Sequence, residues 1–405
     1  MNLQQLYLTD PLTLEFETEL RQLIRLPDGR PAAILERSYF YPTGGGQEYD
    51  TGRLGPARVI EVFKQEQPPA ILHVLDQEIP PGLVAGKIDA ERRLRHMQHH
   101  SAQHLLTQCF IHLMGLETVS AHINGYTPSS LDLDAAEAIS RFDLSRVESL
   151  ANRIIYENRP IKTYFVSSAE LASLPLRRPP KVSEDIRIVE IDGFDYSACG
   201  GTHVLHTGSI GTAKIVKAER QNDKIRIYFV AGIQAMELFR EYYDILSSLA
   251  NQMSCGAVDL PQAIQRQAEQ LKAAQKELGA LRPLALAYEA SRLAEASSRL
   301  NEVRLVTAAF HQRPASELRA IADELKKFPD TVALLASYDG GKISLLATCG
   351  RDTGQDARRL LKRCLDPFGG RGGGDASLAQ GGGTATPEQF QALFANPETI
   401  LQELI

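Results

Sequence analysis

The first ninety residues alternate between short hydrophobic runs and turn-forming residues. The runs are PLTLEFETEL, RPAAILERSYFY, ARVIEVFKQ and AILHVL, and segments such as LPDGRP and PTGGGQEYDTG separate them. Short runs that are rich in β-branched and aromatic residues, with Pro, Gly and Asp between them, are typical of a small barrel or sandwich. The pattern therefore predicts a β domain over residues 1–90, for which we expect a small barrel.

The hydrophobic period changes to that of a helix after residue 89. Apolar residues recur on roughly one helical face between Asp89 and Leu116. Mixed helix and strand patterns follow, and they end in the strand-like runs IRIVEI, TAKIVKAER and KIRIYFVA. We therefore expect an α/β domain over residues 91–232.

Residues 233–303 are polar, rich in Ala, Leu, Glu and Gln, and almost free of glycine. Ile264, Leu271 and Leu278 repeat every seven residues, which is the spacing of a helical seam. Pro283 is expected to kink or end the first long helix. The pattern predicts a helical hairpin or coiled-coil linker. Its seam can pack within one chain or between two, so a homodimer is one of two outcomes.

The last hundred residues alternate between strand and helix patterns. The order is strand VRLVTAAF, helix ASELRAIADELKKF, strands TVALLASY and KISLLATC, and helix DARRLLKRCL, followed by FGGRGGGDASLAQGGG. This order predicts a small α/β domain over residues 304–405 with a glycine-rich loop that is either flexible or exposes its backbone. The fold class as a whole is therefore α+β and multidomain.

Composition and length support a globular protein with several domains. The chain has 405 residues, 43% of them hydrophobic and 23% charged, which is more than one core usually organises. Its five cysteines are far apart and odd in number, which argues against a disulfide framework. The N-terminus lacks a basic start and an apolar block, and no run of about 18 apolar residues occurs. We expect a cytoplasmic protein without a membrane partner.

Two short segments carry residues that bind transition metals. The stretch RHMQHHSAQHLL contains two pairs of histidines four apart, His96 with His100 and His100 with His104, and either pair projects to one face of a helix. The stretch DYSACGGTHVLH adds Cys199 and His203, also four apart. Nitrogen and thiolate donors favour tetrahedral zinc over magnesium or calcium. The residues alone leave open which histidine pair binds.

The same segments resemble a known family. HHSAQHLL and CGGTHV are similar to the paired zinc motifs in the editing domain of alanyl-tRNA synthetase and its freestanding relatives, the AlaX proteins. FYPTGGGQEYDTGRL resembles the glycine-rich motif of the preceding β domain, and GTAKIVKAERQNDKIRIYFVAG resembles the hairpin that follows the second zinc motif. GGRGGG with AQGG resembles the terminal domain of the synthetase, which the long AlaX form shares. The resemblance implies a zinc ion held by His100, His104, Cys199 and His203.

The resemblance also implies a reaction. It points to a trans-editing hydrolase that deacylates tRNA(Ala) carrying a wrong amino acid, chiefly serine, with glycine as a second candidate. Residues 91–232 would be the deacylase domain and residues 304–405 a tRNA-binding domain. A pocket for alanine rejects serine or glycine weakly, so a second sieve is needed. We see no class II aminoacylation motifs before the β domain and expect no charging of tRNA.

The glycine-rich motif supplies the candidate catalytic residues. By resemblance, Thr43 would read the hydroxyl group of serine. Gly44, Gly45 and Gly46 would let the backbone pass close to the terminal adenosine, and Gln47 would hydrogen-bond there.

Basic residues supply candidate contacts to the phosphates of tRNA. In the first half these are Arg92, Arg93, Arg95, Arg177, Arg178 and Lys181, and in the terminal domain Arg358, Arg359, Lys362, Arg363 and Arg371.

Two other functions fit the residues. Four protein ligands normally close the coordination shell of zinc, so a non-catalytic tRNA-binding protein with structural zinc is one alternative. An editing domain of threonyl type is the other, although the terminal glycine-rich domain argues against it.

Asp192 and Asp195 either orient ligand histidines or serve as turn residues. MQHHS lacks the aspartate of the DHH phosphoesterase motif, which excludes nuclease activity of that type.

Overall fold

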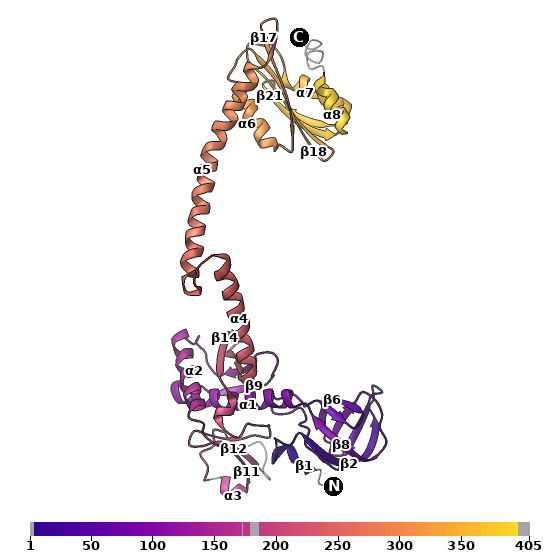
Figure 1. The fold of residues 1–405 in the computed structure, drawn as a ribbon, viewed down its shortest axis with the longest axis vertical. Helices are drawn as coiled ribbons and strands as arrows, with labels where there is room; N and C mark the ends of the chain where they lie inside the picture. The colour runs from indigo at the N-terminus through magenta and orange to yellow at the C-terminus, as the bar shows by residue number, and fades with distance from the viewer. Residues whose placement is uncertain (1–3, 172, 179–185, 396–405) are drawn as a thin grey trace. The chain divides into compact units, whose positions relative to one another are not determined.

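The computed structural model describes residues 4–171, 173–178 and 186–395, and the chain divides into two compact units, Met1–Ser248 and Leu249–Ile405 (Figure 1). The architecture is multidomain α+β, as expected. No helix within these described ranges combines the length and the apolar character that crossing a membrane requires.

Six strands of the first unit close into a barrel, in the order β2-β3-β7-β6-β5-β8. Their bounds are Glu15–Arg25 for β2, Pro31–Leu35 for β3, Gly52–Leu54 for β5, Ala57–Gln65 for β6, Ala70–Leu75 for β7 and Gly82–Ile88 for β8. The barrel rather than the sandwich forms because β8 pairs with both β2 and β5 and so joins the two ends of the sheet. β5 and β8 carry no hydrophobic pattern that marks them as strands. A short pair, β1 (Gln4–Gln5) with β4 (Arg37–Ser38), and the 3-10 helix η1 (Leu6–Leu8) lie outside the barrel.

Helix α1, Ala90–Met114, follows the barrel and carries the four clustered histidines. Asp89 caps its first turn by accepting from Arg92 N, and Gly115 ends it in a left-handed conformation. The guanidinium of Arg93 is 1% exposed and pairs with Asp50 of the barrel at 2.5 Å, while also donating to the carbonyls of Pro11 and Tyr39. This buried ion pair fixes the start of α1 against the barrel.

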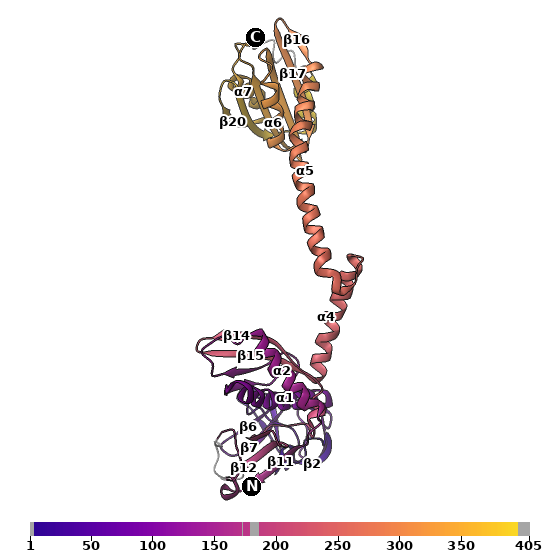
Figure 2. The same ribbon diagram turned by 90° about the vertical axis from the view of Figure 1, so that its left-hand side faces the viewer.

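Two sheets surround α1 in the rest of the first unit. A four-stranded sheet has the order β14-β15-β10-β9, and a three-stranded sheet has the order β11-β12-β13. Figure 2 shows α1 and α2 beside the β14–β15 hairpin. The elements are β9 (Thr118–His122), β10 (Ser129–Leu133), α2 (Arg141–Tyr156), β11 (Ile161–Val166), α3 (Ser168–Leu171), β12 (Ile186–Ile191), β13 (Asp195–Ala198), η2 (Thr207–Ile210), β14 (Ala213–Gln221) and β15 (Lys224–Ala231).

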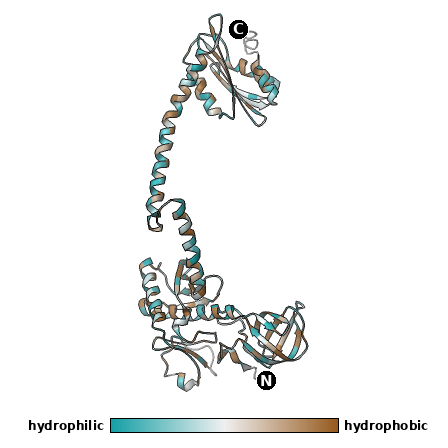
Figure 3. Cartoon of the chain, viewed as in Figure 1, coloured by the Kyte–Doolittle hydropathy of each residue, from teal (hydrophilic) through white to brown (hydrophobic). Residues whose placement is uncertain are grey.

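Two long helices occupy the segment for which we predicted a hairpin or coiled coil. They are α4 (Gly232–Gln252), which crosses the boundary between the units, and α5 (Leu260–Glu295), with η3 (Ala257–Asp259) between them. Of the two effects predicted for Pro283, a kink or the end of the helix, the second is wrong, because α5 continues through it. The carbonyl of Gly279, which loses its donor, lies in an exposed stretch where water can bind it. Apolar residues recur along both helices (Figure 3), and the predicted seam is exposed at Ile264, Leu271 and Leu278.

The second unit is built on a six-stranded sheet of order β16-β17-β18-β19-β21-β20. Its elements are β16 (Ser298–Leu300), β17 (Val303–His311), α6 (Ala315–Leu325), β18 (Thr331–Asp339), β19 (Lys342–Cys349), α7 (Ala357–Leu365), η4 (Asp366–Phe368), β20 (Arg371–Gly374), β21 (Leu378–Thr384) and α8 (Pro387–Ala395). The predicted order of strands and helices is confirmed for β17 through α7.

The prediction of a flexible glycine-rich loop is wrong. The glycines form the antiparallel pair β20 and β21 at the edge of the sheet. A Cβ on Gly381 would lie 2.5 Å from Leu365 Cδ1, and one on Gly372 would lie 2.8 Å from Leu361 Cδ2, so the absence of side chains lets α7 pack directly on this hairpin.

Candidate metal centre

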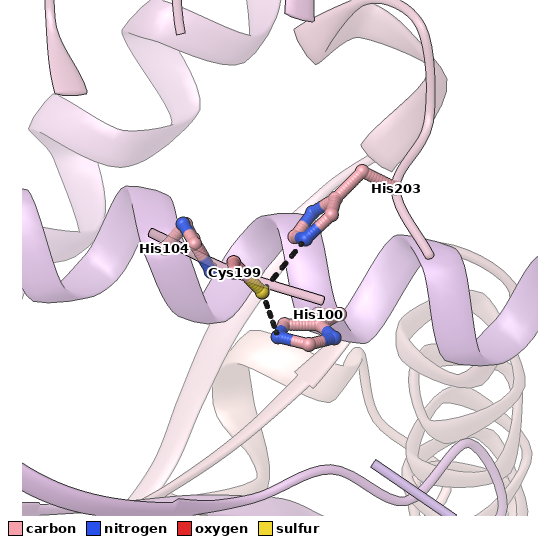
Figure 4. A group of neighbouring side chains, drawn as sticks. All are labelled: His100, His104, Cys199 and His203. Atoms are coloured by element: carbon pink, nitrogen blue, oxygen red, sulfur yellow. Dashed lines mark hydrogen bonds between the residues drawn. The ribbon is translucent and has the colours of Figure 1, made fainter. Parts of the chain in front are cut away.

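Four potential metal ligands meet between α1 and the turn that follows β13. They are His100 and His104 of the helix and Cys199 and His203 of the turn, and one ligand atom from each lies within 4.8 Å of all the others (Figure 4). Cys199 Sγ lies 3.4 Å from His100 Nε2 and 3.4 Å from His203 Nε2. The structure thus brings together the two segments that the four-residue spacing of histidine and cysteine indicated as sources of metal ligands.

The Nδ1 atom of each of these histidines is held by another residue. His100 Nδ1 lies 2.8 Å from Gln47 Oε1, and His203 Nδ1 lies 3.1 Å from Ser101 Oγ. His104 Nδ1 lies 3.3 Å from Asp195 Oδ2. Partners of this kind set the tautomer of a ligand histidine and leave Nε2 free to bind a metal. All three imidazoles are therefore oriented as ligands.

The donor set fits zinc. With the usual Zn–S and Zn–N bond lengths, the sulfur and a nitrogen at two corners of a tetrahedron are about 3.5 Å apart, close to the separations at Cys199. Burial raises the pKa of Cys199, but the imidazoles of His100 and His104 outweigh it and hold that pKa well below its usual value. Burial, followed by the charge of His100, lowers the pKa of His203, which favours the neutral ligand form.

The two other histidines of the cluster lie outside this group. His99 Nδ1 bonds Ser129 Oγ at 2.7 Å, and its Nε2 accepts from Ala231 N. His96 is fully buried, and neither of its ring nitrogens has a hydrogen-bond partner. Burial lowers the pKa of His96 to about 3, so its ring is neutral. The structure therefore selects His100 and His104 from the two pairs that the sequence allowed.

A cavity of about 620 Å³ opens beside the four ligands. His100, His104 and Cys199 line it, together with Gly45 of the glycine-rich motif. Its lining contains four cationic side chains and one carboxylate, and these are Lys64, Arg177, Arg178, Arg187 and Glu117. The carboxylate is paired with Arg178 at 2.7 Å. The cavity is therefore net positive and suited to an anionic ligand.

The glycine-rich motif borders this cavity through one residue. Gly45 lines it, while Thr43 is exposed and is absent from the described lining. Gly46 packs so closely on the next segment that a Cβ there would lie 2.4 Å from Ala121 O. Gly44 pairs with Gln47 across the turn, and its carbonyl accepts from Tyr41 Oη at 2.7 Å.

The assignment of Gln47 to substrate binding needs correction. Gln47 is 1% exposed, its Nε2 donates to Thr202 Oγ1 at 2.9 Å, and its Oε1 accepts from Thr202 N at 3.1 Å and faces His100 Nδ1. With both ends of the amide engaged, Gln47 ties the barrel to the ligand turn and orients His100.

Some of the predicted tRNA contacts of the first unit are accessible, and others are buried. Arg92 is half-buried against Glu48 and Tyr49, and Arg177 and Arg178 line the cavity. Arg93 was predicted to contact a tRNA phosphate, but its buried pairing with Asp50 removes it from the residues that can reach one. Arg95 is also buried, and pairs with Glu91 and Glu237. Lys181 lies outside the described residues.

The predicted contacts of the second unit are all exposed. They lie on α7 and β20 and are Arg358, Arg359, Lys362, Arg363 and Arg371. Arg358 pairs with the capping residue Asp356.

The two aspartates proposed from the sequence have different places in the structure, and two further residues at the centre were not predicted. Asp195 orients His104, whereas Asp192 pairs with Lys162 at 2.7 Å, away from the ligands. Ser101 and Arg187 were missed, because a serine inside a helix and an arginine in the strand-like run IRIVEI show no local signal of a role in a site.

Two models of known protein families match parts of the chain. Residues 186–228 match the model of the Threonyl and Alanyl tRNA synthetase second additional domain, and residues 302–403 match the DHHA1 domain. The structure is also similar to the crystal structure of the C-Ala domain from Aquifex aeolicus alanyl-tRNA synthetase, with 29% identity, a TM-score of 0.24, and coverage of 26% of this chain and 96% of that one.

Curated relatives extend the similarity over most of the chain. It is 31% identical to the alanine–tRNA ligase of Korarchaeum cryptofilum over 93% of this chain and 43% of the ligase. It is 32% identical to that of Methanosarcina acetivorans over 97% of this chain and 44% of the ligase. The chain thus spans less than half the length of these relatives. The matches to the second additional domain, to the DHHA1 domain and to these ligases together identify it as an AlaX-like protein that is related to domains of alanyl-tRNA synthetase.

Proposed function

We propose that this protein is a zinc-dependent hydrolase that deacylates tRNA(Ala) carrying a wrong amino acid, chiefly serine, with glycine as a second substrate. The observation that carries the proposal is the place of His100, His104 and Cys199, three of the four potential metal ligands, at the wall of a cationic cavity. The kinship with alanyl-tRNA synthetase supports the choice of tRNA(Ala).

The charge of the cavity supports a nucleic-acid substrate. The 3′ end of a tRNA brings phosphates to the scissile ester, and Lys64, Arg177 and Arg178 of the cavity lining are our candidates to hold them. The lack of a side chain at Gly45 lets the acceptor end approach the backbone of the barrel.

The residues around the ligands prepare the site for ester hydrolysis. Gln47, Asp195 and Ser101 hold the three imidazoles so that their Nε2 atoms converge. Zinc, when bound, would supply a Lewis acid next to the acyl group. Thr43, which lies outside the described lining, remains our candidate for reading the hydroxyl of serine. Thr107 is one of the hydroxyl-bearing residues that do line the cavity.

The exposed cations of the second unit support a further contact with the tRNA. Arg358, Arg359, Lys362, Arg363 and Arg371 would bind phosphates away from the acceptor end. The exposed apolar residues of α4 and α5 fit a homodimer in which helices of two copies pack together.

The test is a deacylation time course with seryl-, glycyl- and alanyl-tRNA(Ala), comparing wild type with Cys199→Ala at measured zinc content. Cys349→Ala, which changes a buried cysteine of the second unit, is the matched control. We expect wild type and the control to release serine and spare alanine, and Cys199→Ala to lose both zinc and activity.

The same assay separates the alternatives. If wild type binds tRNA(Ala) and holds zinc but releases no amino acid, the proposal fails and the protein is a tRNA-binding module with structural zinc. Faster release from seryl-tRNA(Thr) than from seryl-tRNA(Ala) would instead identify editing of threonyl type.

A further inference from the structure

Arg187 places a buried positive charge next to the candidate metal centre. It stands near the start of β12 and is 6% exposed. Its Nε donates to Leu8 O at 2.8 Å, and its Nη1 donates to Cys199 O at 2.7 Å and to Gly201 O at 3.0 Å. The side chain is therefore held rigidly, with its guanidinium against the turn that carries the cysteine ligand.

One nitrogen of this guanidinium has no partner. Nη2 is buried and makes no hydrogen bond, and the groups that act on the charge of Arg187 are Cys199, Tyr41 and Tyr7, none of them a carboxylate. Other buried arginines of the first unit differ in this respect, since Arg93 pairs with Asp50, and Arg95 pairs with Glu91 and Glu237.

An arginine that is buried without a carboxylate is costly, because it cannot lose its proton to become neutral. Of the described groups that act on Arg187, Cys199 is the one that is anionic near neutral pH, and a bound zinc ion would neutralise that thiolate. The cost is understandable if a further partner arrives with the substrate. Arg187 lines the cavity together with His100, His104 and Cys199, so a ligand bound there would contact this residue.

Ester hydrolysis creates such a partner. Water adds its oxygen to the acyl carbon and releases a proton to solvent, which places negative charge on the acyl oxygen. The bond between the acyl carbon and the ribose oxygen then breaks, and the ribose oxygen takes a proton. Hydrogen-bond donors that are fixed in advance in a water-poor site stabilise this charge strongly.

We propose that Arg187 is a catalytic residue whose Nη2 stabilises the negative charge that develops on the acyl oxygen of an aminoacyl ester. This inference rests on the proposed deacylase function and adds a residue to it. It differs from a role in which Arg187 only fastens the ligand turn, because that role would affect zinc and substrate binding but would not favour an anionic transition state.

The test compares wild type, Arg187→Met and Arg187→Lys as full-length, zinc-loaded proteins acting on seryl-tRNA(Ala). For Arg187→Met we expect kcat to fall by about 100-fold to 1,000-fold, the typical effect of removing one such donor. We expect KM to stay within about threefold, as for an interaction made only in the transition state. Zinc content should be unchanged, and Arg187→Lys should recover about tenfold of the lost rate by restoring the charge.

A binding ratio provides a second measurement that does not depend on the folded fraction. The probes are a phosphonate analogue of seryl-adenosine, which is anionic and tetrahedral, and its neutral amide-linked counterpart. Wild type should prefer the phosphonate, and both variants should lose much of that preference. A binding ratio that is the same in wild type and variants overturns the inference. So does a variant in which only KM or zinc content changes and kcat does not. If Arg187→Met folds poorly, the same comparison is made with Arg187→Lys.

The two failures can be told apart. An inactive wild type sinks the deacylase function and this inference together. An active wild type whose Arg187→Met variant keeps its kcat sinks only the role of Arg187.

Discussion

Gly201 lies against the imidazole of His100, so closely that a Cβ at position 201 would be 2.1 Å from His100 Cε1. The same Cβ would be 3.2 Å from Gln47 Oε1, the atom that holds His100 Nδ1. The neighbouring Gly200 has no heavy atom within 4 Å of its added Cβ. The two glycines of the CGGTH turn therefore have different roles, although the sequence does not distinguish them.

This difference predicts the effect of adding one methyl group. Gly201→Ala should push His100 out of line with Cys199 and weaken zinc binding by at least the roughly 10-fold to 100-fold seen when the support of a ligand is lost. Gly200→Ala, the matched control, should bind zinc as wild type does. Zinc affinity measured by competition with a chelator checks both, and equal affinities would contradict the placement of His100 in the site.

Asp195 should tune zinc affinity through His104. Its Oδ2 faces His104 Nδ1, and removing its charge in Asp195→Asn should weaken zinc binding by about 10-fold to 100-fold while the protein stays folded. Asp192→Asn is the control, because Asp192 pairs with Lys162 instead. Chelator competition at pH 7 is the measurement, and a similar effect of both substitutions would argue against the orienting role.

The buried pair of Arg93 and Asp50 should contribute strongly to stability. Asp50→Ala leaves the guanidinium of Arg93 buried without its carboxylate and should lower the free energy of unfolding by about 3–5 kcal/mol. Glu78→Ala removes the exposed partner of Arg25 and should cost less than about 1 kcal/mol. Urea unfolding followed by circular dichroism compares them, and a small effect of Asp50→Ala would show that α1 and the barrel do not depend on this pair.

His73 should make the barrel less stable in acid. Burial lowers the pKa of His73 to about 4, while its Nδ1 bond to Ala33 O opposes that shift only in part. In the unfolded chain the group titrates near its ordinary pKa of about 6.5, so between these values only the unfolded form binds the proton. Stability is therefore fully present above about pH 6.5 and falls by about 3 kcal/mol as the pH drops to 4.

Substitution separates this contribution from that of the carboxylates. His73→Gln should reduce the slope of unfolding free energy against pH by about 1.4 kcal/mol per pH unit near pH 5. Ser38→Ala, which removes the partner of His73 Nε2 but keeps the imidazole, should lower stability at pH 7 and leave the slope nearly unchanged. An equal slope in wild type and His73→Gln would mean that His73 is protonated in the folded protein.

Local patterns in the chain were sufficient to predict the elements. Alternation over ARVIEVFKQ and AILHVL predicted β6 and β7 with their observed bounds, and Asp89 marked the start of α1. The four-residue spacing within HSAQH and CGGTH predicted two pairs of donors. Such features depend on the helical period, on alternation and on capping, which act within a few neighbouring residues.

Contacts between distant segments were decided by folding. The choice of His100 with His104 over His96 with His100 depends on a turn that lies a hundred residues away, and the task of Gln47 depends on Thr202 across the junction with the barrel. The glycines after Phe368 form a strand pair because α7 packs on them, which their composition does not reveal. In Arg187, three carbonyls from two distant segments bind Nε and Nη1 and leave Nη2 without a partner, which the sequence does not reveal either. A side chain acquires partners of this kind from the folded arrangement, and no local period in the sequence records them.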